Sequence, residues 1–208
     1  LVNVVGITEG VWATIITMLF TDYAGSGMHT HMSLFEGDTN AFDDPNDPMG
    51  LSKVARSFMA GILKHASEIS LVTNQWVNSY KRISGGFEAP ISATWSSGNR
   101  CTMLRVPRYM PNKSSSRRVE VRTPDPGCNP YLAFAAIFAA GLKGVEEGYE
   151  IPPEAEEDVN LMHPKERKAM GYPDLPKSLA SALACFESSE LMAEALGEHV
   201  FEFLIRSK

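Results

Sequence analysis

The segment 118–148 most constrains the fold of this chain, because its pattern changes from that of a strand to that of a helix within a few residues. Residues 118–122 alternate strictly between charged residues and valines, which is typical of a β-strand. The alternation places three charges on one face, which either is solvated or faces a cavity. Asn129 and Pro130 then supply a helix N-cap and a suitable first helical residue. The run that follows is almost entirely apolar until Lys143 and predicts a long buried helix, which ends at about Glu147 with Gly148 as its natural C-cap.

Charge is distributed unevenly along the 208 residues. The chain has 19 basic and 25 acidic residues and a net charge of −6, which argues against a general nucleic-acid binder. Residues 100–122 nevertheless contain seven basic residues and one acid, Glu120, which we expect to stay ionised there. Arginine binds phosphate and carboxylate through paired hydrogen bonds, so this window predicts a site for small anions. A basic surface patch is the alternative.

The cysteines and the apolar segments bear on the cellular compartment. The three cysteines are odd in number and widely spaced, which fits reduced thiols in a cytoplasmic protein. The apolar stretch 11–20 is shorter than the roughly 20 residues that span a bilayer. No basic residue precedes it, as a signal peptide would require. We therefore expect a cytoplasmic protein without a membrane partner.

Other segments have patterns of their own. Residues 51–71 place their apolar side chains on one stripe, which predicts a single helix with Ser52 as its N-cap. Asp, Asn and Pro dominate residues 38–48, which predicts a surface loop, and residues 1–35 suggest extended segments and turns. Residues 150–176 are acidic and rich in proline, which predicts a long surface excursion. The other predicted elements are strands at 91–95 and 102–106 and helices at 164–170, 177–186 and 189–205.

Two histidines and a serine occupy alternate positions after a glycine-rich turn. In an extended segment, His29, His31 and Ser33 would point to the same side. Neutral imidazole is a good ligand for a divalent metal and a good donor to phosphate. Gly25 and Gly27 let the backbone approach a ligand closely. Such a histidine pair is more often structural, so this pattern alone is a weak functional signal.

A charged pair, Arg82 and Glu88, brackets a Gly-Gly turn in the segment 80–90. One interpretation is a surface loop whose salt bridge contributes under about 1 kcal/mol. The other is an arginine that holds an anion, with a carboxylate across the loop. In the basic window, a metal-binding carboxylate beside several arginines would suit phosphoryl transfer, in which negative charge on the phosphate oxygens must be offset.

Four segments, in this order, resemble the catalytic domain of bacterial type I glutamine synthetases over about residues 11–208. They are GSGMHTHMSL (25–34), NSYKRISGGFEAP (78–90), NRCTMLRVP (99–107) and RRVEVRTPDPGCNPYLAFAAIFAAGLKG (117–144). The resemblance implies an α+β fold in which a curved, mainly antiparallel sheet carries the site and is backed by helices. It also implies that residues 1–208 are the C-terminal part of a catalytic domain. The N-terminal β-grasp domain and the first metal-binding carboxylates would then be absent, and the isolated chain is expected to lack ligase activity.

The resemblance assigns roles to individual residues. His29 and Glu120 correspond to metal ligands. Gly25 lies where family members contact glutamate, and Arg82 would hold that substrate. Arg122 corresponds to a contact with glutamate or phosphate and, like Arg82, is a catalytic candidate.

The loop and nucleotide contacts follow from the same resemblance. Glu88 keeps the family spacing from Arg82 and belongs to the loop that closes over the active site, which makes it a third catalytic and substrate-contacting candidate. Lys113 is about two positions further from Glu120 than is usual in the family. The implied ATP contacts are His31, Ser33, Arg100, Arg105 and Lys113.

The implied activity is that of an ATP-dependent ligase. The γ-carboxylate of glutamate attacks the γ-phosphoryl group of ATP, while Mg²⁺ or Mn²⁺ and the arginines offset the developing negative charge. Ammonia then displaces phosphate from the acyl phosphate to give glutamine, and a closed loop excludes water. Members of the family assemble as dodecamers of two hexameric rings, so a homo-oligomer is implied.

Departures from the family pattern leave alternatives open. Ala24 stands where many glutamine-forming members have Asn, and residues 74–82 (NQWVNSYKR) are closer to relatives that γ-glutamylate polyamines or ethanolamine. Met162 stands about where regulated members carry an adenylylated Tyr, which predicts that this control is lacking. A non-catalytic structural relative is a second alternative. A guanidino-phosphotransferase is the third, and it would need a reactive cysteine near the phosphates; Cys101 adjoins Arg100.

Overall fold

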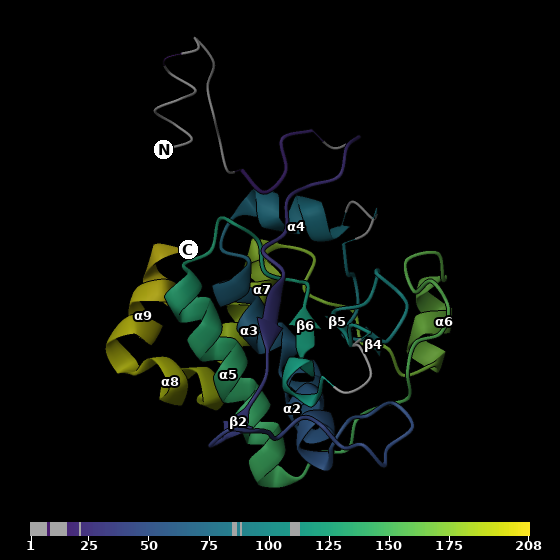
Figure 1. The fold of residues 1–208 in the computed structure, drawn as a ribbon. Helices are drawn as coiled ribbons and strands as arrows, with labels where there is room; N and C mark the ends of the chain where they lie inside the picture. Colours follow the sequence, from purple (N-terminus) through teal and green to yellow (C-terminus); the bar gives the residue numbers. More distant parts are fainter. Residues whose placement is uncertain (1–7, 9–15, 21, 85–86, 88, 109–112) are drawn as a thin grey trace.

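A computed structural model of the chain describes residues 8, 16–20, 22–84, 87, 89–108 and 113–208 (Figure 1). The predictions made for Glu88 and for residues 11–15 of the apolar stretch lie outside these residues. One hydrophobic cluster joins the valines of the predicted charged strand to the apolar faces of the long helices. No helix among the described residues is both long and apolar enough to cross a membrane.

Four short strands form the main sheet, in the order β1-β6-β5-β4. They are β1 (Thr30–Met32), β6 (Val119–Val121), β5 (Leu104–Arg105) and β4 (Trp95–Ser96). β1 and β5 both pair antiparallel with the central β6, whereas β4 pairs parallel with β5. This mostly antiparallel sheet, packed together with helices, confirms the α+β class.

The predicted strands at 91–95 and 102–106 are longer than the strands in the structure. Ser92 bridges to Asp174 in the proline-rich excursion instead of extending β4. The predicted loop at 38–48 is also wrong at its start, because Thr39–Asn40 forms β3, which pairs with β2 (Phe35–Glu36). The side-chain amide of Asn40 also connects β3 to the segment before β6, because it donates a hydrogen bond to the carbonyl of Arg117 at 2.8 Å.

The single helix predicted at 51–71 is two helices. α2 (Lys53–Lys64) and α3 (Ala66–Thr73) are separated by His65, whose backbone leaves the helical region at φ −95° and ψ 14°. After the break, α3 packs against both α5 and α7. Ser52 is the N-cap, as predicted, and its hydroxyl accepts a hydrogen bond from the backbone N–H of Ala55 at 3.1 Å.

The long apolar helix α5 (Pro130–Glu147) lies beside α2 (Figure 1). Asn129 caps its start, and Gly148, with a φ of 64°, ends it, as predicted. The expectation that the whole helix is buried is wrong, because Tyr131 is 83% exposed and Phe134 and Phe138 are also exposed. The buried face consists mainly of small residues, which allow α2 to approach closely. Its members are Ala133, Ala136, Ile137, Ala140, Gly141 and Gly144.

The two helices touch at a pair of glycines. A Cβ atom added to Gly144 would lie 2.1 Å from the carbonyl oxygen of Ser57 and 2.6 Å from the nitrogen of Gly61. A Cβ atom added to Gly61 would lie 2.2 Å from the carbonyl oxygen of Ala140. These distances are far below van der Waals contact, so the packing of α2 on α5 depends on both glycines.

The C-terminal third contains the excursion and three further helices. The excursion includes the predicted short helix, α6 (Pro164–Ala169), and a small core of its own around Val159. α7 (Leu179–Glu187) follows Ser178, which is its N-cap. The helix predicted at 189–205 is divided into α8 (Glu190–Leu196) and α9 (Glu198–Ser207), because Gly197 has a φ of 74°. In Figure 1, α6 and the pair α8 and α9 lie on opposite sides of the sheet.

Candidate functional site

Strand register places three of the predicted site residues in one row across the sheet. Glu120, at the centre of β6, lies opposite His31 of β1 and opposite Arg105 of β5. Paired positions on neighbouring strands share a face, and so do alternate residues along one strand, such as Glu120 and Arg122. Glu120 is only 3% exposed and Arg122 only 5% exposed. The charged side chains of this strand face therefore form a cluster that is buried at Glu120 and Arg122 and partly exposed at Arg118, and the alternative of a solvated face is excluded for the two buried residues.

Two arginines hold the carboxylate at the centre of this cluster. Arg105 Nε donates to Glu120 Oε2, and Arg122 Nη1 donates to Glu120 Oε1 at 3.1 Å. Burial alone would raise the pKa of Glu120, but the hydrogen bond from Arg105 and the charges of both arginines outweigh it and lower that pKa. Glu120 is therefore a carboxylate at neutral pH, as the sequence predicted.

The two histidines of the glycine-rich segment converge on the same carboxylate. His29 Nδ1 lies 3.2 Å from Glu120 Oε1, and His31 Nε2 lies 3.9 Å from it. Arg118 Nε donates to His31 Nδ1 at 3.1 Å, so the neutral ring of His31 carries its proton on Nε2. Burial lowers the pKa of both histidines, and the charge of Arg122 lowers that of His29 further. This environment favours neutral imidazole, the form that binds metals.

The donor types in the cluster suit a hard divalent cation. Mn²⁺ and Mg²⁺ accept carboxylate oxygen, and Mn²⁺ also accepts imidazole nitrogen. Within the part of the chain that the structure describes, no group of three or more His, Cys, Asp or Glu side chains is arranged to hold a metal ion. His29 and Glu120 therefore fit as part of a metal site, and a cation bound there would take its other ligands from water, substrate or further protein.

Arg82 approaches the cluster from α4 (Val77–Ser84), a helix that the sequence analysis did not predict. Its guanidinium donates to the main-chain carbonyls of Thr123 at 2.8 Å and Arg122 at 3.0 Å. Burial lowers the pKa of Arg82, and the negative charge of Asp125 opposes that effect. The ordinary pKa of arginine is so high that the side chain stays charged. Arg82 is thus a buried cation in a fixed position.

Sequence reasoning missed Asp125, which is fully buried next to this arginine. Its carboxylate accepts hydrogen bonds from Thr17 Oγ1 at 2.9 Å, Asn74 Nδ2 at 3.0 Å and the backbone N–H of Gly127 at 2.9 Å. The sequence here has a Pro-Asp-Pro-Gly turn signal, which does not indicate burial. Asp125 thus links Thr17, which precedes the glycine-rich turn, to Asn74 at the end of α3, and it places a negative charge near Arg82.

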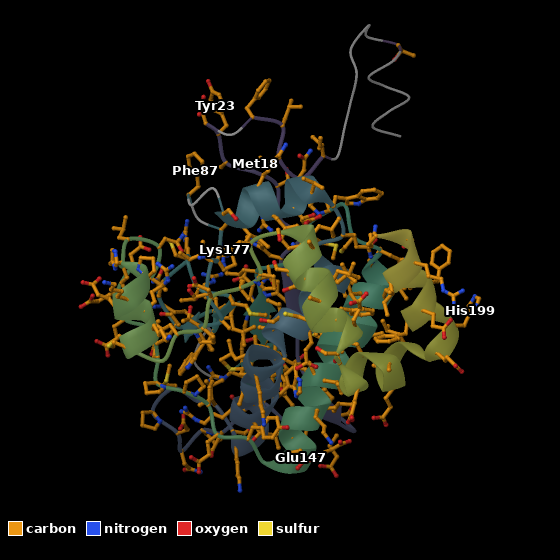
Figure 2. The ribbon with its side chains drawn as sticks, turned by 180° about the vertical axis from the view of Figure 1, so that it is seen from behind. Met18, Tyr23, Phe87, Glu147, Lys177 and His199 are labelled. Carbon is orange, nitrogen blue, oxygen red and sulfur yellow. The ribbon has the colours of Figure 1, made fainter. Side chains whose placement is uncertain are left out.

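A cavity of about 300 Å³ opens between Arg82, Arg122 and His29. Gly27 forms part of its wall, and a Cβ atom there would lie 2.6 Å from Arg82 Nη2 and 2.8 Å from His29 Nε2. Gly27 therefore lets the backbone lie close to these two side chains, while the predicted approach of this turn to a ligand stays a prediction. Figure 2 shows Met18 and Phe87 at the same end of the molecule, beside α4. The other lining residues are Met18, Ala24, Gly25, Phe87 and Ala89.

A second hollow, of about 560 Å³, lies between β1 and α5. His31 and Ser33 line one side of it, and the exposed rings of Phe134 and Phe138 line the other. A flat aromatic group could stack against such rings while polar atoms reach the strand. His31 belongs both to this hollow and to the charged cluster, so the two are adjacent.

Two predicted site residues in the described part of the chain, Arg100 and Lys113, are exposed. Arg100 is exposed, and its backbone carbonyl accepts a hydrogen bond from Arg122 Nε at 3.0 Å. Lys113 is exposed and precedes the short 3₁₀ helix η1 (Ser114–Ser116), which packs on β3. Within the described part of the chain, neither side chain lines the cavity beside Arg82. Glu88 lies outside the described residues.

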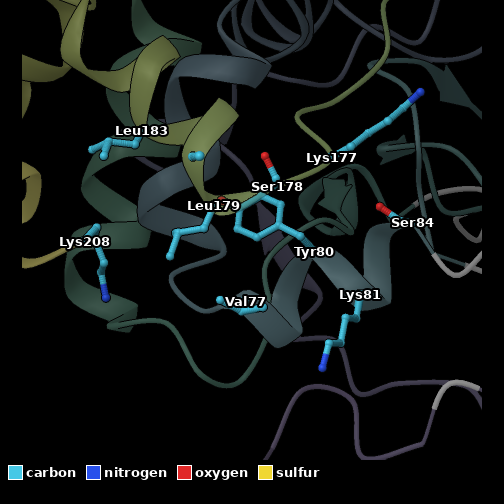
Figure 3. Close-up of a pocket in the computed structure, with 10 residues that line it drawn as sticks. Val77, Tyr80, Lys81, Ser84, Lys177, Ser178, Leu179, Leu183 and Lys208 are labelled. Atoms are coloured by element: carbon cyan, nitrogen blue, oxygen red, sulfur yellow. The ribbon is translucent and has the colours of Figure 1, made fainter.

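A further cavity, of about 540 Å³, lies between α4 and α7 (Figure 3). Val77 and Tyr80 of α4 and Leu179 of α7 form its walls, and Lys81, Lys177 and Lys208 lie at its margin. None of the predicted site residues that the structure describes lines it. The chemistry-bearing residues thus gather around Glu120 and not at this cavity.

The sheet of this α+β fold carries a buried carboxylate, two imidazoles and a set of arginines that can bind small anions. The glutamine synthetase catalytic-domain model matches residues 1–208, and the chain belongs to that family, which is a family of ligases. The family expectation drawn from the four sequence segments is therefore confirmed.

Similar proteins agree with this assignment. The chain is 60% identical to a glutamine synthetase of Mycolicibacterium smegmatis over all 208 residues and 45% identical to one of Thermotoga maritima over 206 residues. These matches cover 47% and 46% of those proteins, so the chain spans about half the length of the curated relatives it matches. A solved structure of a GmaS/ADP complex superposes with a TM-score of 0.85 at 32% identity, covering 100% of this chain and 47% of that one.

Proposed function

We propose that the chain forms the C-terminal part of the catalytic domain in an ATP-dependent ligase that joins the γ-carboxyl group of glutamate to ammonia through γ-glutamyl phosphate. The observation that carries this proposal is the buried Glu120, paired with Arg105 and Arg122 and 3.2 Å from His29. The 60% identity to a curated glutamine synthetase supports the same reaction. The remaining metal-binding carboxylates would belong to polypeptide outside residues 1–208.

In this proposal, glutamate occupies the cavity beside Arg82 and Arg122, with Gly25 in contact. Both arginines are fixed by hydrogen bonds, so they bind and orient a carboxylate without having to be ordered first. Arg105 uses Nε for Glu120, which leaves the other end of its guanidinium for a phosphate oxygen. Glu88 is proposed to act over the same cavity.

The nucleotide is proposed to lie in the hollow between β1 and α5. His31 and Ser33 would contact it, and Phe134 and Phe138 offer rings on which the base can stack. The phosphates would then extend past His31 towards Arg105, with Arg100 and Lys113 as outer contacts. The similarity to a GmaS/ADP complex supports nucleotide binding by this fold.

The metal is proposed to be Mg²⁺ or Mn²⁺, held in part by His29 and Glu120. Bound there, it would offset negative charge on the transferred phosphoryl group. Arg105 and Arg122 hold the Glu120 carboxylate in position, and the low pKa of this group keeps it able to bind a cation at neutral pH.

The assembly is proposed to be a homo-oligomer in the cytoplasm, a dodecamer of two hexameric rings as in the family. Membership of the glutamine synthetase family supports this assembly, and exposed aromatic residues on α5 and α9 would be available for subunit contacts. Tyr131 is 83% exposed and Phe203 is 64% exposed.

A second candidate reaction uses the same first step with a polyamine or ethanolamine in place of ammonia. The observation that favours it is Ala24 in the wall of the proposed glutamate cavity, where a small apolar side chain leaves room for a larger amine. The similarity to GmaS at 32% identity does not distinguish the amines, because ADP is the ligand of that complex and no amine is named with it.

An amine panel tests the choice. The complete protein with ATP, glutamate and Mn²⁺ or Mg²⁺ would be offered ammonium, putrescine, spermine and ethanolamine, while phosphate and γ-glutamyl products are measured. We expect ammonium to exceed each other amine by about 100-fold in kcat/KM, as a site built for a small nucleophile would. Ala24→Asn should narrow the cavity and lower any polyamine turnover while leaving ammonium turnover within about twofold.

Other outcomes would contradict specific parts of the proposal. Turnover with putrescine or ethanolamine but not with ammonium would replace glutamine synthesis by the second candidate. Binding of ATP without any phosphate release would support the non-catalytic relative. Phosphorylation of a guanidine with no γ-glutamyl product would support the phosphotransferase.

A further inference from the structure

Asn160, in the proline-rich excursion, contacts the rim of the cavity beside Arg82. Its side-chain amide nitrogen donates to two main-chain carbonyls, that of Phe87 at 3.1 Å and that of Ala89 at 3.0 Å. Phe87 and Ala89 both line the cavity. A single amide thus fixes two points of the rim that are two residues apart in the chain.

The orientation of this amide is defined by its surroundings. If the amide were flipped, its oxygen would face two carbonyl oxygens, which repel it, so the nitrogen must face them. In the observed orientation the Oδ1 atom is buried and has no hydrogen-bond partner among the described residues. A buried polar atom without a hydrogen-bond partner is unfavourable. The orientation of Asn160 therefore satisfies the two carbonyls of the rim and leaves its own Oδ1 atom without a partner among the described residues.

Phe87 is the described non-glycine residue with a left-handed backbone, at a φ of 54°. A bulky L-residue adopts this conformation only when its surroundings impose it, and such strain is concentrated at functional sites. The hydrogen bond from Asn160 to the carbonyl of Phe87 is one such restraint. It keeps a large aromatic residue, 48% exposed, at the mouth of the cavity.

The other side of Asn160 is anchored in the body of the protein. The preceding residue, Val159, is fully buried in the small core of the excursion with Ala155 and Tyr172. That core is joined to β4, because the backbone N–H of Ala155 donates to the carbonyl of Trp95 at 2.9 Å. Restraint can therefore pass from the sheet through the excursion to the cavity rim.

We propose that Asn160 is a positioning residue, which fixes Phe87 and Ala89 so that the rim excludes water from the reacting acyl phosphate. This rests on the proposed function. When ammonia attacks the acyl carbon, the bond from carbon to the phosphate oxygen breaks, and the products are the amide and hydrogen phosphate, which takes up the proton lost by nitrogen. When water attacks instead, the same bond breaks and the products are the glutamate carboxylate, hydrogen phosphate and one proton, so ATP is consumed without amide formation.

The test uses Asn160→Asp, which has nearly the same size but cannot donate from that position when ionised. In the complete protein we expect amide formation to fall by about tenfold or more, because a small displacement at an active site is costly. The ratio of phosphate released to amide formed should rise from one to at least about two, because water gains access. The KM for ATP should stay within about twofold, since Asn160 lies away from the proposed nucleotide hollow.

A matched control lies three residues further on in the same excursion. His163→Ala removes the capping box of α6 but leaves both hydrogen bonds of Asn160 in place. It is expected to keep the phosphate-to-amide ratio at one. A ratio near one for Asn160→Asp, or an equal rise in both variants, would overturn the positioning role.

Hydrogen exchange gives a readout that does not depend on activity. Backbone amides in a peptide containing residues 87–89 should exchange at least about tenfold faster in Asn160→Asp than in the parent protein and in His163→Ala. Unchanged exchange would overturn the proposal even if the ligase reaction is correct. A parent protein that forms no γ-glutamyl product would refute the proposed function and leave the exchange experiment to decide whether Asn160 restrains the rim.

Discussion

Replacing Glu120 by glutamine is expected to lower ligase activity of the complete protein by about 1,000-fold or more, because a charged metal ligand and the anchor of two arginines are lost together. Glutamine cannot neutralise Arg105 or the buried Arg122, so the two cations would repel each other at the proposed phosphate position. The measurement is amide formation at saturating ATP, glutamate and ammonium.

For Glu120→Gln, activity lost through misfolding must be distinguished from activity lost because the carboxylate itself is missing. Breaking a buried ion pair by removing one partner costs about 3–5 kcal/mol, so Glu120→Gln is also expected to unfold at lower temperature. Glu120→Asp keeps the negative charge but shortens the side chain, and should recover most of the stability and little of the activity. Glu36→Gln, an exposed carboxylate on β2, is the control and should change activity by less than about twofold. More than a tenth of the parent activity in Glu120→Gln would refute its role.

Replacing Gly144 by alanine is expected to destabilise the protein by at least about 3 kcal/mol, at the upper end of what overpacking causes. The added methyl group would lie 2.1 Å from the carbonyl oxygen of Ser57, which belongs to the backbone of α2 and cannot turn aside. α2 and α5 would have to separate. The measurement is the midpoint of thermal or urea unfolding in the complete protein.

A glycine in open space provides the matched control. Nothing lies within 4 Å of a Cβ atom added to Gly98. Gly98→Ala should therefore change the free energy of unfolding by less than about 0.5 kcal/mol. Equal stability of Gly144→Ala and Gly98→Ala would mean that the two helices are not in backbone contact.

The charged strand and the capped helix were predictable because they depend on local rules. Alternation at 118–122 correctly placed Glu120 and Arg122 on one face, and Asn129 and Gly148 correctly marked the ends of α5. Their burial was not predictable from alternation, since a solvated face has the same pattern. The roles assigned to individual residues came from family resemblance and stay predictions.

The sequence predictions are wrong or incomplete where contacts between segments distant in the chain determine the structure more than the local sequence pattern does. Residues 51–71 have one apolar stripe, yet the helix breaks at His65, and α3 beyond the break contacts α5 and α7. Asp125 has the sequence context of a turn, but its three hydrogen bonds come from residues as far away as Thr17. No single-sequence rule connects positions that are 108 residues apart.

The hydrogen bonds that fix Arg82 have an evolutionary consequence. Its guanidinium donates to the backbone carbonyls of Arg122 and Thr123, not to their side chains. Substitutions at either position keep those carbonyls, so the arginine retains its anchor as long as the backbone path is kept. Descendants of this protein could therefore change the side chains around the cavity, and with them the preferred amine, while Arg82, the residue proposed to bind glutamate, keeps its position.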